Sequence, residues 1–414
     1  MRQINSQQKL INIFFNTILA GTILSLIAAL LYYVYAFAAL SVGDRSFDWL
    51  LGAFSDFVYI MNVSLEKSPY VIADSSYPPF AIIILYPFAM ICKEVFAQYA
   101  GLDLNVDELT SRLTLHGEFW VAIALFTLIC SAAVIYALTK LWNIAHKDML
   151  KLAFITLFAA PFVFTIMRGN TVYFALILTI LFLAFERSDS ALVREIGYLC
   201  LVLAGLIKIY PLFFGVFLLC KRKIWASVRI AAYSLISFFM SFWLFRGNED
   251  LLPFLKNLVG FASNNTRLGA PNNLSLPSLL NKFFSLFKID TDSVPIRIAV
   301  IAILFILFIT SAIAAIISKN DFSRYVIASS AVILIPPISY FYVLIFAILP
   351  FFEFLREHEN MKIAKRIFYT AAFLFLFLIP TMAAQNYIIH SILILTMLLT
   401  ELISIFKGRD VRSV

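Results

Sequence analysis

Long apolar runs recur along this chain, separated by short polar segments, and they constrain its fold more than any other feature. Of the 414 residues, 62% are hydrophobic and only 14% are charged, whereas about a quarter of an ordinary soluble domain is charged. One soluble core cannot hold this surplus of apolar side chains, so many of them must face lipid. The sequence therefore predicts an all-α polytopic membrane protein.

The positive-inside rule places the apolar runs, because clusters of Lys and Arg mark cytoplasmic loops. Five segments carry this signal: KLWNIAHKDMLK, CKRKIW, SKNDFSR, REHENMKIAKR and the C-terminal KGRDVR. One arrangement satisfies all five if the runs 195–220 and 325–354 each break into two crossings, at KIYP and at IPPIS. Residues 1–414 then form a single integral membrane domain with about 12 transmembrane helices and both termini in the cytoplasm.

Two segments, 41–118 and 246–294, remain as large loops on the outer face. The apolar run before them, 11–40, is too long for a signal-peptide core, and we interpret it as a retained anchor. The run 80–92 is too short to cross, since its helix spans about 20 Å against about 30 Å of hydrocarbon. We therefore expect interfacial helices in the first outer loop, and we expect the chemistry on this face.

Several classes of function find no support in the sequence. The four Cys residues form no CxxC pair, so they favour buried apolar packing over disulfides or a zinc site. No P-loop, dinucleotide-binding, HExxH or nucleophile-elbow motif is present. The net charge of +8 is interpreted as a topology signal, and no nucleic-acid partner is expected.

The segment SFDWLLGAFSDFVYIMN, residues 46–62, is strongly apolar and yet contains Asp48 and Asp56. Asp56 and Tyr59 are three residues apart and share a helical face. A carboxylate on an interfacial helix beside a membrane cavity can act as a general base. We assign this role to Asp56, whereas Asp48 is interpreted as hydrating the outer rim of the helix.

Cations near the outer face are candidates for a phosphate site. Lys208 lies within an apolar run, where a lysine costs about 2.5–3.5 kcal/mol on insertion scales, and Tyr210 with the following Pro breaks the helix beside it. Arg168 lies in the short hairpin TIMRGNTVYF between two crossings. Arg112 and His116, four residues apart, either contact a lipid phosphate or anchor the chain in the interface.

Polar and aromatic side chains in two outer segments could bind a sugar, and a third outer segment, SSYPPF, is interpreted as a turn. The stretch NNTRLGAPNNLSLPSLL contains Arg267, Asn272 and Asn273, and amides both donate and accept, although Asn is also an ordinary turn residue. Tyr340, in IPPISYFYV, would stack on a sugar or belong to an aromatic belt. Tyr77, in SSYPPF, precedes two Pro residues that open the interfacial helix.

The order of these motifs resembles a known superfamily. An acid after the first crossing, a YPP helix, a Gly-Asn hairpin, KIYPLFF with LLCKRKIWA, NNLSLPSLL and PPISYFYV follow one another. This series resembles the integral-membrane GT-C glycosyltransferases, in particular the bacterial polyprenyl-phosphate-mannose-dependent mannosyltransferases. It is also similar, less closely, to the O-antigen glucosyltransferases.

The resemblance implies roles for particular residues. Asp56 would be the catalytic base, Tyr77 with its two prolines would shape the acceptor side, and Asn170 and Lys208 would line the donor site. The family's Gly-Gln before this Asn is Arg168-Gly169 here. The position of the family's late His is near Tyr342, which receives no role.

The resulting hypothesis is a hexosyltransferase in the bacterial inner membrane. It moves a sugar from a polyprenyl-phosphate donor to a lipid-linked glycan, the O-antigen, on the periplasmic face. Lys208, Arg168, Arg112 and Arg267 would bind the phosphate. The expected partners are these two substrates and membrane lipids, and neither a cofactor nor a divalent metal is expected. The alternatives are a lipid-linked sugar flippase or transporter, and an O-antigen polymerase or ligase. The sugar, glucose or mannose, remains open.

Overall fold

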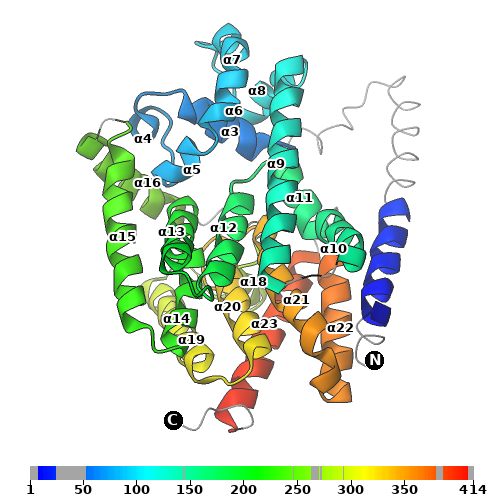
Figure 1. Cartoon of the computed structure of the whole chain (residues 1–414). Coiled ribbons are helices and arrows are strands. Elements are labelled where there is room, and N and C mark those ends of the chain that lie inside the picture. Colours follow the sequence, from blue (N-terminus) through cyan, green and yellow to red (C-terminus); the bar gives the residue numbers. More distant parts are fainter. Residues whose placement is uncertain are drawn as a thin grey trace.

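The computed structural model describes residues 8–24, 53–142, 144, 146–245, 247–262, 270, 273–291, 293–378 and 386–408. Within these ranges the chain forms helices and no β-strand, which confirms the all-α class. Figure 1 shows the longer helices side by side in a bundle, with a group of short helices at one end. We call these short helices, α3 to α8, the cap.

The first half of the described chain consists of the short helices of the cap, one long helix (α9) and three shorter helices that follow it. The cap consists of α3 (Ser55–Ser64), α4 (Pro69–Ile72), α5 (Pro79–Ile83), α6 (Tyr86–Ile91), α7 (Lys93–Tyr99) and α8 (Val106–Leu113). It is followed by α9 (Gly117–Trp142), α10 (His146–Phe158), α11 (Ala160–Arg168) and α12 (Val172–Phe185). The segment predicted as one interfacial helix is thus divided between α5 and α6, and α7 follows at an angle of 88°.

The remaining elements complete the bundle. In the middle of the chain they are α13 (Ala191–Ile207), η2 (Tyr210–Gly215), α14 (Val216–Cys220), α15 (Ile224–Phe242), η3 (Gly247–Asp250), α16 (Leu251–Ala262) and α18 (Leu276–Leu286). Towards the C-terminus they are α19 (Val294–Ile317), α20 (Asp321–Leu334), η4 (Phe341–Ala347), α21 (Ile348–Glu357), η5 (His358–Asn360), α22 (Ile363–Leu378) and α23 (Asn386–Phe406). Many of these helices are shorter than the apolar runs that contain them.

The predicted count of about 12 transmembrane helices is not confirmed. In the described part of the chain, four helices are long and apolar enough to cross a membrane, namely α9, α15, α19 and the Tyr387–Phe406 part of α23. The count rises to six if two bent helix pairs each form one span. The two counts differ because the prediction located apolar runs along the sequence, whereas a crossing needs about 20 apolar residues within one continuous helix. The first predicted crossing lies partly outside the described residues.

Proline explains where the two predicted helix breaks occur. α13 ends at Ile207, Lys208 takes an extended conformation, and Pro211 is the second residue of the 3₁₀ segment η2. α20 ends at Leu334, just before the Pro336-Pro337 pair, and η4 follows. Because proline lacks an N–H and its ring clashes with the carbonyl of the preceding turn, a helix does not continue through either site. The structure confirms both breaks.

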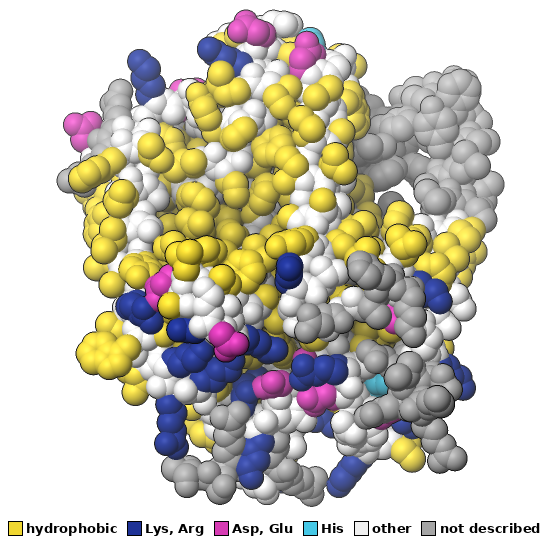
Figure 2. All heavy atoms as spheres, viewed as in Figure 1, with side chains coloured by type: hydrophobic (Ala, Val, Ile, Leu, Met, Phe, Trp, Pro, Cys, Tyr) yellow, Lys and Arg dark blue, Asp and Glu magenta, His cyan; other side chains and the backbone are white. Residues whose placement is uncertain are grey.

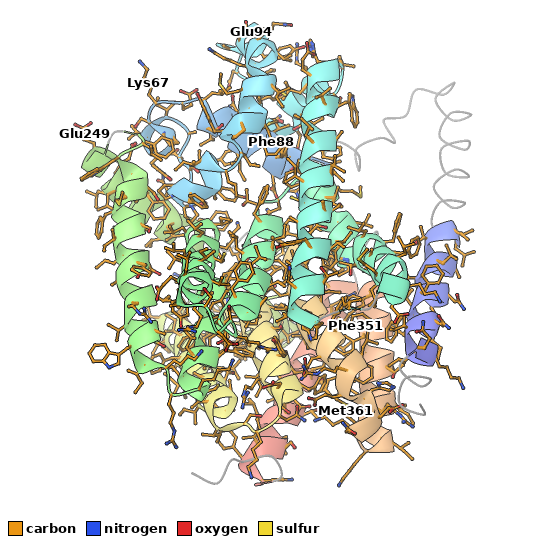
Figure 3. All side chains as sticks on the ribbon, in the orientation of Figure 1. Lys67, Phe88, Glu94, Glu249, Phe351 and Met361 are labelled. Carbon is orange, nitrogen blue, oxygen red and sulfur yellow. The ribbon has the colours of Figure 1, made fainter. Side chains whose placement is uncertain are left out.

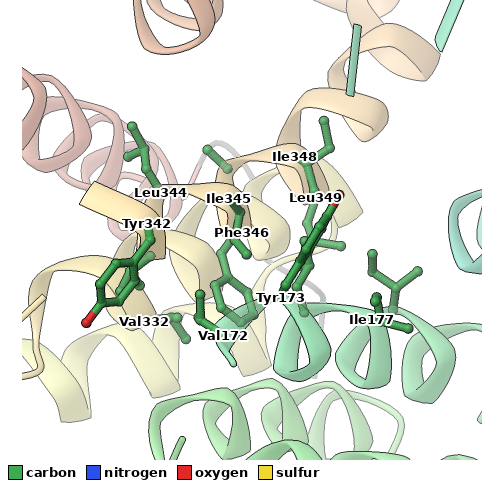
Figure 4. Close-up of a cluster of buried hydrophobic side chains, with 14 of the residues drawn as sticks. Val172, Tyr173, Ile177, Val332, Tyr342, Leu344, Ile345, Phe346, Ile348 and Leu349 are labelled. Atoms are coloured by element: carbon green, nitrogen blue, oxygen red, sulfur yellow. The ribbon is translucent and has the colours of Figure 1, made fainter. Parts of the chain in front are cut away.

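Aromatic and branched side chains fill the space between the helices (Figure 3). One part of this core joins α12 to η4 and α21, where Tyr173 lies beside Phe346 and Leu349 (Figure 4). All four Cys residues are buried, as predicted, and none is joined in a disulfide within the described residues. On the outside, Figure 2 shows a hydrophobic band between two charged ends. Apolar residues of α15 such as Leu235 and Ile236 are exposed. This surface fits a membrane protein.

Candidate functional site

Asp56 lies in the first turn of α3, and a hairpin from far along the sequence holds its carboxylate. Arg168 donates from Nη2 to Oδ1 at 2.7 Å and from Nε to Oδ2 at 3.3 Å. Asn170 donates from Nδ2 to Oδ2 at 2.8 Å. These three residues form the carboxylate cluster. The Asp56 side chain is 16% exposed to solvent, so a substrate hydroxyl can still reach it.

The hairpin between α11 and α12 presents both donors because of Gly169. This residue ends α11 in the left-handed region, with φ of 61°. A Cβ atom placed on it would lie 2.3 Å from the Cβ of Phe57, one residue after Asp56. The Asn170 side chain also accepts a hydrogen bond from the Val172 N–H at 3.0 Å, at the start of α12. Close packing of Gly169 on α3 therefore sets the position of the cluster.

Lys208 lies near the carboxylate cluster, and Tyr77 connects the two. The Lys208 Nζ is 4.2 Å from the centre of the Tyr77 ring and 6.0 Å from that of Tyr342. Both distances are typical of cation–π contacts. Across the described ranges, no carboxylate forms an ion pair with this lysine. A partly buried cation held by ring faces alone is suited to binding an anionic ligand.

The Tyr77 phenol stays protonated in this environment. Burial, and then the negative charge of Asp56, raise the pKa of Tyr77 well above its ordinary value. The charge of Arg168 and a hydrogen bond with Asn170 oppose this shift. The phenol therefore interacts electrostatically with the carboxylate cluster, and its ring makes the cation–π contact with Lys208. A neutral phenol can donate a hydrogen bond to a sugar or phosphate oxygen.

The structure also locates the other tyrosines predicted from the sequence. The Tyr59 ring lies 6.0 Å from that of Tyr77, and its hydroxyl donates to the Ala73 carbonyl at 3.1 Å. The Tyr340 ring lies 5.9 Å from Tyr342. The buried Tyr210 hydroxyl has no hydrogen-bond partner in the part of the chain that is described. Tyr342, to which the sequence assigned no role, thus joins the group, and its signal was the aromatic break PPISYFYV.

Arg112 and His116 come together around a different residue. The Arg112 guanidinium lies 5.6 Å from the centre of the Tyr99 ring, and the Tyr99 hydroxyl is 2.9 Å from His116 Nε2. These contacts join α7 to the end of α8, within the cap. The structure groups both residues with Tyr99 instead of with Asp56, so their predicted substrate contacts stay predictions.

Asn273 uses its side chain to connect two backbone segments. Its Oδ1 accepts hydrogen bonds from the N–H groups of Ser275 at 3.1 Å and Ser339 at 2.9 Å, and its backbone pairs with Tyr340. These bonds tie the start of α18 to the Pro336-Pro337 break. Asn273 therefore supports the segment that carries Tyr340 and Tyr342. The predicted sites Arg267 and Asn272 lie outside the described residues.

A metal site would need several ligating side chains close together. Where the structure is described, no group of three or more His, Cys, Asp or Glu residues has that arrangement. The charged side chains around Asp56 are Arg168 and Lys208, both cations that suit an anionic ligand.

Comparison with known proteins identifies the family. Among curated proteins, none matches the chain significantly. The profile of Glycosyltransferase family 87 matches residues 76–339, which is more than half of the chain. The match begins just before Tyr77 and includes the hairpin, Lys208 and Asn273. The chain therefore belongs to glycosyltransferase family 87, a family of the GT-C superfamily of integral-membrane enzymes.

Proposed function

We propose that this protein transfers a hexose from a polyprenyl-phosphate-linked donor to a lipid-linked glycan, the O-antigen, on the periplasmic face of the inner membrane. Membership of a glycosyltransferase family supports group transfer over transport. The observation that carries the proposal is that Tyr77 contacts Lys208, which has no acidic partner among the described residues, and is influenced by the charge of the held carboxylate of Asp56. A base and an anion site are thus adjacent.

The reaction is a direct displacement at the anomeric carbon. Asp56 accepts the proton of an acceptor hydroxyl, and the hydroxyl oxygen forms the new bond to the anomeric carbon. The bond from that carbon to the phosphate oxygen breaks, and the polyprenyl phosphate leaves with the electron pair. Arg168 and Asn170 act as positioning residues, because their hydrogen bonds orient the Asp56 carboxylate.

Lys208 is proposed to bind the donor phosphate. Its ammonium group lies on the Tyr77 ring, and it can approach the leaving oxygen as negative charge develops there. Preorganised charges in a site from which water is excluded stabilise such a transition state by several kcal/mol. A phosphate role for Arg168 in addition to its contact with Asp56 is part of the same proposal. The donor carries one phosphate, and these cations can neutralise it, so no divalent metal is required.

Replacing Lys208 with Met should raise the KM for the donor by about ten- to a hundredfold, because a hydrogen bond to a charged group contributes about 1.5–3 kcal/mol. The Lys208→Arg variant should retain part of the affinity, since the charge remains. Kinetics with the donor and the acceptor varied separately will check this. An unchanged donor KM in Lys208→Met would remove the phosphate role from this residue.

The proposed activity is tested with purified protein in liposomes, a short-chain polyprenyl-phosphate sugar and a purified lipid-linked glycan. Parallel reactions with glucose and mannose donors identify the sugar by mass spectrometry of the product. We expect one donor to be used and the reaction to continue in EDTA. Absence of transfer with either donor would contradict the proposed substrates. Complete loss in EDTA, restored by a divalent ion, would contradict the metal-free mechanism.

A further inference from the structure

A second charged site lies where α14 leads into α15. A cavity of about 600 Å³ opens there, and it is lined mainly by side chains of positive charge. Its six cations are Arg187, Arg194, Lys221, Arg222, Lys223 and Arg229. Its two carboxylates are Glu186 and Asp189. We call this site the basic cavity.

The basic cavity lies at the opposite end of α15 from the cap. α15 has 19 residues and is one of the helices apolar enough to cross a membrane. At its C-terminal end the Phe242 ring packs 5.6 Å from that of Tyr70 in α4. Its N-terminal end, at Lys223, lines the cavity about 28 Å away by the rise of an α-helix. An apolar span therefore separates the cavity from the cap, and Figure 1 shows α15 running from the cap towards α14.

The carboxylates do not neutralise the cations of the basic cavity. Buried Glu186 contacts Lys221, Lys223 at 3.3 Å and Arg187 at 3.7 Å, so one negative charge faces three positive ones. Arg194 donates to the backbone carbonyls of Ser188 and Asp189, which are uncharged acceptors. A surplus of positive charge remains at the mouth of the cavity.

Arg222 and the start of α15 add to this surplus. Arg222 is exposed and forms no ion pair in the described part of the chain, although Arg229 pairs with Glu195 outside the cavity lining. No side chain caps the first turn of α15 at Lys223. The unpaired N–H groups of that turn carry partial positive charge and favour an anion.

Apolar side chains extend from the basic cavity along the outside of the bundle. Trp225 is 80% exposed and Ile224 is 61% exposed at the beginning of α15. On the neighbouring helix α13, Leu192 and Leu199 are exposed as well. Tryptophan is enriched where a membrane helix meets the headgroups. The cations therefore lie at the edge of an apolar surface, where a headgroup would meet its acyl chains.

We propose that the basic cavity binds the headgroup phosphate of an anionic phospholipid, whose acyl chains lie on the exposed apolar residues of α13 and α15. A basic pocket between membrane helices suits such a headgroup. A soluble phosphate would use the same cations but would gain nothing from the exposed Trp225 and Leu192. The site is separate from the carboxylate cluster, so the proposal does not depend on the proposed transfer reaction.

The test measures the thermal unfolding of the full-length protein in detergent during titration with phosphatidylglycerol. We expect the unfolding temperature to rise with phosphatidylglycerol and to stay constant with phosphatidylcholine. In Arg222→Gln the half-saturating lipid concentration should rise about fivefold, since a Lys or Arg near an anionic membrane surface contributes about 1 kcal/mol. Reversing the charge in Arg222→Glu should weaken binding further.

Lys288→Gln is the matched control, because Lys288 is also an exposed cation with positive φ, 55° against 56° for Arg222, and lies outside the cavity lining. This variant should respond to phosphatidylglycerol as the unmodified protein does. Equal half-saturating concentrations in Arg222→Glu and the unmodified protein would overturn the proposed site. The full stabilisation by inorganic phosphate alone would overturn the assignment to a lipid.

Discussion

The Asp56→Asn protein is expected to fold and to lose transfer activity by about 10²- to 10⁴-fold, the range that a general base contributes. Asn has nearly the same shape as Asp, so Arg168 keeps an acceptor, but the side chain can no longer take a proton. Donor affinity should hold or improve, because the loss of a carboxylate next to Lys208 favours an anionic ligand. Rates with saturating donor and acceptor will check the loss.

Asp74→Asn is the control for this experiment. Asp74 is an exposed acid of the same cap, it has a positive φ of 46°, and Asn accepts that conformation readily. Its activity should equal that of the unmodified protein. If Asp56→Asn transferred sugar at the normal rate, the assignment of the base would be wrong. If it bound the donor tenfold more weakly, the charge relationship with Lys208 would be wrong.

The Gly169→Ala protein is expected to be destabilised by about 2–5 kcal/mol and to lose most of its activity. The added methyl group would meet Phe57 at 2.3 Å, far inside van der Waals contact, and the left-handed φ of 61° adds strain. Relief of this clash moves α3 away from the hairpin, which separates Asp56 from Arg168 and Asn170. Thermal unfolding and transfer rates of the reconstituted protein will measure both effects.

The Gly101→Ala variant separates the effect of the clash with Phe57 from the effect of the left-handed φ. Gly101 is in the same cap with a φ of 82°, and a Cβ placed on it would have no atom within 4 Å. This variant should therefore show only the strain of a left-handed Ala, about 1–2 kcal/mol, with activity retained. Equal losses of stability and activity in the two variants would show that close packing against Phe57 has no special importance.

Local sequence signals predicted much of the fold and part of the candidate site. The helix breaks beside Lys208 and at Pro336-Pro337 follow from proline chemistry, and both were found where expected. Asp56 was chosen from its place in an apolar segment and from a family resemblance, Asn170 from the resemblance alone, and the structure brings them together. The number of crossings was not predictable in the same way, because packing decides how far a helix continues within an apolar run.

Contacts of charged side chains with residues far away in the sequence could not be predicted from local sequence patterns. Arg168 was expected to bind phosphate, and the structure shows it also paired with Asp56, 112 residues earlier in the chain. Arg112 and His116 were predicted as substrate contacts, and the structure adds that both lie against Tyr99. Spacing along one helix predicts which side chains share a face, but it does not tell which other element packs against that face.

By itself, the sequence determined that this chain forms apolar helices interrupted at its prolines, because hydrophobicity and backbone restriction act residue by residue. Only the tertiary structure decided that Tyr77 lies between Asp56 and Lys208, and that six cations surround one cavity at the far end of α15. Those arrangements depend on close packing between helices, as at Gly169 and Phe57, and such contacts exist only once distant segments have come together.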